Sequence, residues 1–269
     1  MDVPHHFKMK TTLILTPNKN EQCGMYQLAK DLAKEFDGEI ITKKNVILLK
    51  HTGRYFKEYP NTKIKVITLL YPMHKWGKWL KEFYNAYWIC YDQKIPHVTK
   101  TYFPNFWRRQ AMRYINWRNN ATMKGADEYW NVTEREQKPR WTEKSKIKIA
   151  NANYATYIGR RTDYKNFNWL QETMKELNID FQPSELNESD LGIHTLISNA
   201  KMLVTASLWE GYGRPVMEAE TLGIPAVAYD VGAHKRCIKK GICVPLNIDN
   251  MEKSEELFME SILEVWNRK

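Results

Sequence analysis

Short apolar runs and helically spaced apolar residues alternate along the first half of the chain. Residues 11–16 (TTLILT) form an uninterrupted β-rich run, which is typical of a strand buried on both faces. Met25, Leu28, Leu32 and Phe36 then recur at the spacing of one helix face. The same patterns predict further strands at 39–42, 46–49, 64–71, 97–102 and 130–133, and helices at 76–94 and 106–122.

The second half of the chain repeats this alternation, beginning at residue 154 after a polar, linker-like stretch at 137–145. Strands alternating with helices predict an α/β protein with two doubly wound, Rossmann-like domains, which we place at 1–152 and 153–269. The last helix is a candidate to pack back on the first domain. The predicted strands are 154–159, 179–182, 201–206, 226–229 and 241–245, and the predicted helices are 167–177, 191–200, one that begins at Pro215, and about 254–266.

Composition narrows the class of protein. Hydrophobic residues make up 43% and aromatic residues 13% of the 269 residues, which excludes global disorder. No apolar run approaches the ~18–20 residues of a membrane span, and the N-terminus lacks the apolar core of a signal peptide. We therefore expect a soluble, cytoplasmic chain. The four cysteines form no CxxC pair and no zinc-like cluster, which favours free thiols.

The formal net charge of +10 favours an anionic partner, which could be a phosphate-bearing ligand, an acidic membrane surface or nucleic acid. The basic residues are spread along the chain, with local densities at 100–118 and 234–240. A spread of this kind is more typical of a solvated surface than of a nucleic-acid groove.

The stretch SLWEGYGRPVMEAETLGIPAV, residues 207–227, joins a predicted strand to a predicted helix. Such a turn lies where open α/β sheets bind ligands. Its glycines allow close approach of the backbone, and the free amides at the start of a helix favour anions. Glu210 is expected in the turn itself and Glu218 in the first turn of the helix that begins at Pro215. Two carboxylates beside a phosphate-binding turn suggest a ribose and a sugar, although a surface glutamate and a helix-start charge explain them equally well.

A pair of basic residues follows the first predicted strand of the second half. In YIGRRTDYKNF, Arg160 comes directly after the strand and Lys165 stands just before a helix. Two cations at the carboxyl end of a strand can clamp a diphosphate, the arginine by its bidentate fork and the lysine as a point charge. Taken alone, this pattern is also that of a solvated basic loop.

The order of these motifs resembles that of the retaining glycosyltransferases of family 4, which have the GT-B fold. The pattern Gly-Arg-x4-Lys is followed by S-x-x-E-G-[FY]-G-x-P-x-x-E-A, whose Glu-x7-Glu pair is the hallmark of that family, and then by a G-x-P-x-[VA] strand. A weaker resemblance covers the first half. The matching segments are 157–165, 207–219, 223–228 and 230–232, with weaker matches at Gly24 and the helix after it and at 126–134.

The resemblance implies a donor substrate, a UDP- or GDP-linked hexose, that lies mainly on the second domain. Arg160 and Lys165 would hold the diphosphate and stabilise the leaving group. Glu210 would contact the transferred sugar, and Glu218 the ribose hydroxyls. The catalytic residues implied are thus Glu210, Arg160 and Lys165, and the donor-binding residues are Gly24, Gly159, Gly211, Tyr212, Gly213, Arg214 and Glu218.

The family pattern needs neither a metal nor another cofactor, and the chain has no DxD motif. The resemblance also implies retention of configuration, by attack on the face from which the leaving group departs.

The chain departs from the family pattern at three points. Many relatives carry a histidine near the sugar in the first domain, where IPHVTKTYF places Tyr102, a tentative sugar contact. His97 has the opposite strand parity and is expected to be a packing residue. Arg214 stands where leucine is common, so it either adds a cation near the phosphates or faces solvent. The chain is also short for the fold.

The acceptor, which could be a lipid, a glycan or another hydroxyl compound, is left open by the sequence. The aromatic stripe of 76–94, with lysines beside it, and the segment NFWRRQAMRYINWR at 105–118 are candidates for peripheral contact with an acidic membrane surface. Helices packed in the core are the alternative. Aromatic and basic residues also suit nucleic acid, so a DNA-modifying glycosyltransferase stays open. So does a non-catalytic module that binds nucleotide sugars or nucleic acid.

Overall fold

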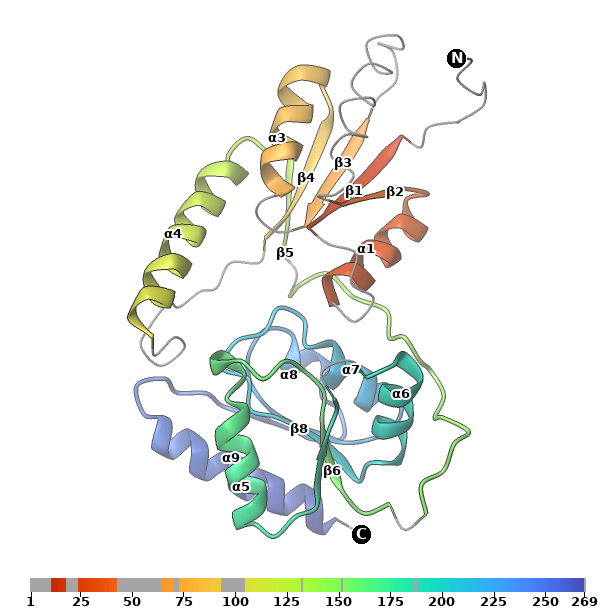
Figure 1. Ribbon diagram of the computed structural model, residues 1–269, viewed down its shortest axis with the longest axis vertical. Coiled ribbons are helices and arrows are strands. Elements are labelled where there is room, and N and C mark those ends of the chain that lie inside the picture. The colour runs from red at the N-terminus through yellow and green to blue at the C-terminus, as the bar shows by residue number, and fades with distance from the viewer. Residues whose placement is uncertain are drawn as a thin grey trace. The chain divides into compact units, whose positions relative to one another are not determined.

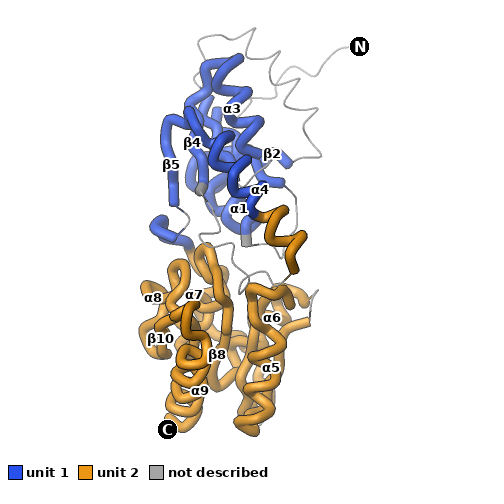
Figure 2. The backbone as a smooth tube through the Cα atoms, turned by 90° about the vertical axis from the view of Figure 1, so that its left-hand side faces the viewer, with its two compact units in different colours: residues 1–94, 113–137 blue, residues 95–112, 138–269 orange. Residues whose placement is uncertain are grey.

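The computed structural model describes residues 11–17, 24–42, 64–69, 73–92, 105–131, 133–150, 152–185 and 188–268. The chain divides into two compact units (Figure 2). The first comprises residues 1–94 and 113–137, and the second residues 95–112 and 138–269. Each unit is built around its own parallel five-stranded sheet with helices against it.

The first sheet has the strand order β2-β1-β3-β4-β5 (Figure 1). Successive side chains of β1 point to opposite faces of the sheet. Leu13 and Leu15 pack against α3, and Ile14 packs against α1. Both faces are thus covered, which explains the uninterrupted apolar run. The strands are β1 (Thr12–Thr16), β2 (Glu39–Thr42), β3 (Lys65–Leu69), β4 (Tyr87–Asp92) and β5 (Glu128–Asn131), and the helices are α1 (Gly24–Glu35) and α3 (Met73–Tyr84). Helix α4 (Phe106–Met123) is divided between the two units after residue 112.

The second sheet has the order β10-β9-β8-β6-β7. Helices α5 and α9 cover one of its faces, and α6 and α7 cover the other (Figure 1). The strands are β6 (Ala155–Tyr157), β7 (Phe181–Pro183), β8 (Met202–Thr205), β9 (Ala226–Tyr229) and β10 (Ile242–Val244). The helices are the 3-10 turn η2 (Asp163–Lys165), α5 (Phe167–Glu176), α6 (Asp190–Asn199), α7 (Arg214–Thr221), α8 (His234–Cys237) and α9 (Met251–Asn267).

The helix predicted at 76–94 is wrong beyond residue 84. Helix α3 ends at Tyr84, and Asn85 has the left-handed φ of 50° that commonly ends a helix. The remaining aromatic residues form β4, in which Trp88 and Tyr91 are fully buried. Aromatic residues have a high strand propensity, and a fully buried strand shows no alternation that would have separated it from a helix.

The division between the units differs from the boundary expected at 152/153. Residues 138–150 have no regular secondary structure but pack on the second unit. Trp141 lies against the core beneath α6 and α7, and the amide of Ser145 donates to Ser198 Oγ at 2.9 Å. Helix α9 buries Phe258 and Ile262 in the core of that same unit. The strands predicted at 46–49 and 97–102 lie outside the described residues.

Among the helices of the described residues, none combines the length and the apolar character needed to cross a membrane.

Candidate functional site

The turn after β8 leads directly into α7. Gly213 is the N-cap of α7 and has a φ of 75°, and the helix starts at Arg214 with a proline in its first turn. Glu210 lies outside the helix, as predicted. Glu218 is the fifth residue of α7 and not in its first turn, because the helix begins before Pro215. The helix thus begins one residue earlier than predicted, and Glu218 lies just beyond its first turn, where the helix dipole acts on the carboxylate less than expected.

Glu210 and Lys165 form an ion pair at this turn. The Lys165 ammonium donates to Oε1 of Glu210, and Ser207 Oγ donates to the same oxygen at 3.1 Å. The two charged side chains are only 13% and 16% exposed. Glu210 comes from the loop after β8, and Lys165 from η2, which follows β6. Because β6 and β8 are neighbouring parallel strands, their carboxyl ends bring these loops together.

The charges around Glu210 keep it ionised. Burial raises the pKa of its carboxyl group, whereas the charge of Lys165 and the hydrogen bonds from Lys165 and Ser207 lower it, and the net shift is downward. His234 is also fully buried, and burial lowers the pKa of its imidazole despite the attraction of Glu210. At neutral pH the carboxyl group of Glu210 is therefore ionised and the imidazole of His234 is neutral.

His234 is a residue that the sequence analysis missed. It begins α8, and its Nδ1 lies 2.9 Å from the carbonyl oxygen of Tyr229, so that this nitrogen donates and Nε2 is left with a lone pair. A Cβ atom on Gly213 would overlap Nε2 of this histidine. A Cβ atom on Gly232, at φ 59°, would press on the carbonyl oxygen of Glu210 at 2.6 Å. Glycine is needed at both positions, because Gly213 lies against the side chain of His234 and Gly232 lies against the backbone of the loop after β8.

Arg160 contacts Tyr164, the residue that precedes Lys165 in η2. Its Nη2 donates to the hydroxyl of Tyr164 at 2.9 Å, and the hydroxyl of Tyr157 donates to the carbonyl oxygen of Arg160 at 2.8 Å. Arg160 is exposed, whereas Tyr157 is buried. Burial and the charge of Glu210 raise the pKa of Tyr157 well above its ordinary value, so its hydroxyl keeps its proton. The structure thus gathers Arg160, Lys165 and Glu210, three predicted catalytic residues, at one end of the second sheet.

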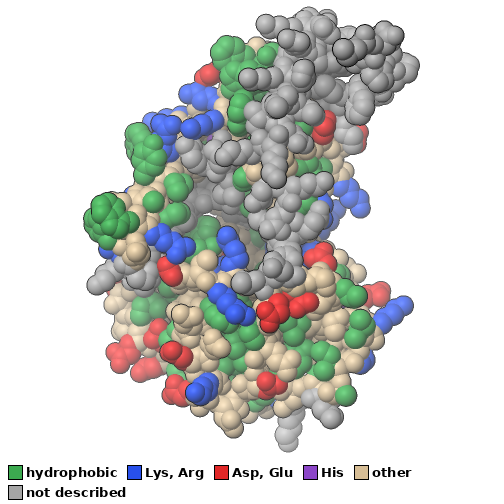
Figure 3. All heavy atoms as spheres, viewed as in Figure 1, with side chains coloured by type: hydrophobic (Ala, Val, Ile, Leu, Met, Phe, Trp, Pro, Cys, Tyr) green, Lys and Arg blue, Asp and Glu red, His purple; other side chains and the backbone are tan. Residues whose placement is uncertain are grey.

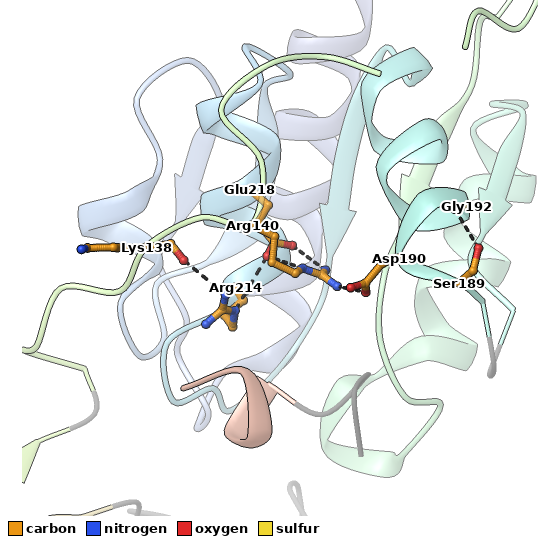
Figure 4. A network of polar contacts seen from close by, with 7 residues as sticks. All are labelled: Lys138, Arg140, Ser189, Asp190, Gly192, Arg214 and Glu218. Atoms are coloured by element: carbon orange, nitrogen blue, oxygen red, sulfur yellow. Dashed lines mark hydrogen bonds and ion pairs between the residues drawn. The ribbon is translucent and has the colours of Figure 1, made fainter. Parts of the chain in front are cut away.

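Glu218 is bound by an arginine that the sequence analysis did not single out. Arg140 binds its carboxylate through two donors, Nε to Oε1 at 2.7 Å and Nη2 to Oε2 at 2.8 Å (Figure 4). Arg140 also reaches Asp190, at the start of α6, through Nη1 at 2.7 Å. Arg214 approaches Oε1 of Glu218 at 3.7 Å and donates to the carbonyl oxygen of Lys138. Arg214 is buried, so the alternative in which it faces solvent is wrong.

The other predicted residues fall into three groups. Gly159 and Gly211 belong to the loops that carry Arg160 and Glu210. Tyr212 is buried under the guanidinium of Arg236, which lies 5.3 Å from its ring centroid. Gly24 begins α1 in the first unit, and Tyr102 and His97 lie outside the described residues.

Two other features bear on ligands. In the described part of the chain, no group of three or more His, Cys, Asp or Glu residues could hold a metal ion. A shallow pocket of about 520 Å³ opens between the end of β7 and α6. Its lining includes Pro183, Glu185, Ser189 and Leu191. It therefore adjoins Asp190, the second partner of Arg140.

The two aromatic helices of the first half differ in their burial. Trp76, Trp79 and Tyr84 of α3 pack against the core of the first unit, so that helix is mainly a core element. Helix α4 turns its aromatic residues outward and has four arginines and no acidic residue. Figure 3 shows hydrophobic and basic side chains interspersed along the edge where α4 runs. The exposed aromatic residues of α4 are Phe106 (54%), Trp107 (78%), Tyr114 (57%) and Trp117 (60%).

The fold and part of the sequence are similar to known proteins. The structure matches that of Anabaena HepE in complex with UDP and glucose with a TM-score of 0.55 at 12% identity, over 95% of this chain and 90% of that one. It matches sucrose-phosphate synthase from Thermosynechococcus elongatus with a TM-score of 0.55 at 13% identity, over 95% of this chain and 94% of that one. No curated protein matches the sequence.

The match to a family model is local. Residues 185–261, from the end of β7 into α9, match the model described as Glycosyl transferases group 1. This segment contains Glu210 and Glu218, whereas Arg160 and Lys165 lie outside it. The chain therefore has the fold of the GT-B glycosyltransferases, and its second unit carries a segment similar to the group 1 family.

Proposed function

We propose that the protein is a retaining glycosyltransferase that moves a hexose from a UDP- or GDP-linked donor to a hydroxyl acceptor. The observation that carries the proposal is the buried Glu210–Lys165 pair at the start of α7, with Arg160 beside it. A carboxylate and two cations at the carboxyl end of a parallel sheet suit a sugar linked to a diphosphate. The local match to the group 1 family supports this choice of substrate.

Each residue has a distinct role in the proposed reaction. Lys165 and Arg160 bind the diphosphate and offset the charge that develops when the bond from the anomeric carbon to the phosphate oxygen breaks. Glu210, held ionised by Lys165, accepts hydrogen bonds from the hydroxyls of the hexose. The amides at the start of α7 face the phosphates. Glu218 accepts hydrogen bonds from the ribose hydroxyls.

The acceptor oxygen forms the new bond on the face that the diphosphate leaves, and its proton passes to a phosphate oxygen of the leaving group. No step of this scheme calls for a metal ion, because the side-chain cations and the helix amides stabilise the negative charge of the departing diphosphate. Turnover is therefore expected to be unchanged in EDTA, and its loss would contradict this part of the proposal.

A ligand screen tests donor binding. We expect UDP, GDP or one of their hexose conjugates to raise the melting temperature of the protein, because a ligand at 100 times its Kd adds about 2.7 kcal/mol of stability. Lys165→Met should lose this shift, whereas Lys175→Met, on α5 and away from the pair, should keep it. If no nucleotide stabilises the wild type while DNA binds strongly, the protein is a nucleic-acid module and the proposal fails.

For the acceptor side, we propose contact with an anionic membrane surface through α4. Its aromatic residues are exposed and its charges are all positive, a combination suited to the headgroup region. Trp107→Ser with Trp117→Ser should weaken sedimentation with vesicles that contain phosphatidylserine, and the exposed Leu263→Ser should not. Unchanged vesicle binding, or binding to DNA in place of vesicles, would contradict this assignment.

A further inference from the structure

Arg140 binds the carboxylate of Glu218, the group that the proposed function assigns to the ribose of the donor. Both oxygens of Glu218 accept hydrogen bonds from this one guanidinium, at 2.7 Å and 2.8 Å (Figure 4). The side chain of Glu218 is 0% exposed in this arrangement. A ligand therefore cannot hydrogen-bond to Glu218 until the guanidinium moves away.

Arg140 can move away from Glu218 and still keep a carboxylate partner. Its Nη1 already contacts Asp190 at 2.7 Å, and the side chain of Asp190 is 51% exposed. The guanidinium carbon also lies 4.2 Å from the ring centroid of Trp141, which is itself stacked on His194. These contacts form a second binding position for the guanidinium next to Glu218. A guanidinium that leaves Glu218 can stay paired and partly stacked, which lowers the cost of its release.

We propose that Arg140 is a specificity-determining residue. In the free protein its guanidinium blocks access to the carboxylate of Glu218, and when the donor binds, the two ribose hydroxyls replace the guanidinium there. A cis diol can replace the guanidinium because each offers two donors to one carboxylate. A deoxyribose offers only one, and it would leave a buried carboxylate oxygen unpaired. The proposal rests on the proposed function, since that function places the ribose at Glu218.

The exchange has a measurable consequence for affinity. If Arg140 is paired with Glu218 in about 90% of the free molecules, the apparent Kd of the donor is about tenfold weaker than that of the open site. Removal of the guanidinium should then strengthen binding. If Arg140 instead held Glu218 in place for the ligand, its removal would weaken binding, so the two roles predict changes of opposite sign.

Calorimetric titration of UDP and of GDP into the full chain tests this. For the nucleotide that binds, Arg140→Ala should lower the Kd about five- to tenfold. Lys138→Ala is the matched control, because Lys138 contributes only its carbonyl oxygen and its side chain points away from the cluster (Figure 4). It should leave the Kd unchanged. In the wild type, the 2′-deoxy form of the same nucleotide should bind at least about tenfold more weakly.

A measurement on the wild type guards against an Arg140→Ala variant that fails to fold. The Nε–H signal of Arg140 in a 15N NMR spectrum, assigned by its loss in Arg140→Lys, should shift on saturation with the nucleotide. A stationary signal, or an unchanged or raised Kd in folded Arg140→Ala, would overturn the role of Arg140 while nucleotide binding stands. Absence of nucleotide binding in both the wild type and Arg140→Ala would instead overturn the proposed function, and this inference with it.

Discussion

At the scale of single residues, the candidate site depends on contacts between side chains that lie far apart in the sequence. Glu210 and Lys165 are 45 residues apart, and Arg140 and Glu218 are 78 apart. The sequence indicated Glu210, Lys165 and Arg160 because each lies in a loop between a predicted strand and a predicted helix and matches a motif of the family that the chain resembles. It could not indicate that Lys165 bonds to Glu210, because strand order decides which loops meet.

Arg140 and His234 were missed for two different reasons. Arg140 lies in a segment without regular secondary structure, where no periodicity shows which side chain points inward. His234 follows β9, the neighbour of β8, so a loop at the same edge of the sheet could have been inferred. What was not predictable is the close contact of its ring with Gly213.

Gly213→Ala tests that contact. The φ of 75° costs an L-residue about 1 kcal/mol, and the added methyl group also meets His234. Gly125→Ala is the matched control, because its φ is 95° but no atom lies within 4 Å of the new methyl group. In urea denaturation, Gly213→Ala should lose at least about 1 kcal/mol more than Gly125→Ala. Equal losses would show that His234 does not press on Gly213.

At the scale of elements, α7 is fixed by a carboxylate with no part in the proposed chemistry. Glu220 accepts hydrogen bonds from four backbone amides, those of Ala226, Lys239, Lys240 and Gly241. It therefore ties α7 to the start of β9 and to the residues before β10. The Glu-x7-Glu spacing singled out Glu218 in the sequence, whereas the structural role of Glu220 is visible only in the tertiary structure.

Glu220→Gln should lower the free energy of unfolding by about 2–4 kcal/mol, because the amide group of glutamine turns N–H donors toward backbone donors. Urea denaturation measures the loss. Glu264→Gln is the control, since its pair with Arg268 is exposed and should contribute less than about 1 kcal/mol. A Glu220→Gln variant as stable as Glu264→Gln would mean that the four amides find other acceptors.

The elements themselves were largely predictable. Strands β2 and β9 have the predicted bounds, since short apolar runs between turn residues are strong signals. The failure at β4 arose because its aromatic residues also fit a helical stripe continued from α3. The face of α4 that carries exposed aromatic residues could not be assigned, since the sequence pattern gives no sign of which side meets the core.

At the scale of the whole molecule, buried neutral histidines predict sensitivity to acid. Burial lowers the pKa of His74 from 6.5 to about 3, and its Nδ1 lies 2.8 Å from Thr68 Oγ1 in the core of the first unit. Below pH 6.5 the unfolded chain takes up a proton that the folded chain refuses, so the stability present above that pH is lost as the pH falls toward 3.

His74→Asn keeps an acceptor near the position of Nδ1 but does not titrate. Between about pH 7 and pH 4, wild-type stability should fall by about 3 kcal/mol more than that of His74→Asn, since each pKa unit corresponds to about 1.4 kcal/mol. Urea denaturation at the two pH values measures both. Parallel losses in the two proteins would mean that His74 is protonated in the folded state or is accessible to water.

The central claim is that the turn around Glu210 activates a nucleotide sugar, and the release of nucleoside diphosphate from UDP- and GDP-hexoses tests it most directly. The account predicts slow release from at least one of these donors by the wild type. Glu210→Gln should reduce the rate about 100-fold or more. Glu176→Gln, an exposed change at the end of α5, should leave it unchanged. Release from none of the donors, or equal rates for Glu210→Gln and the wild type, would contradict the account.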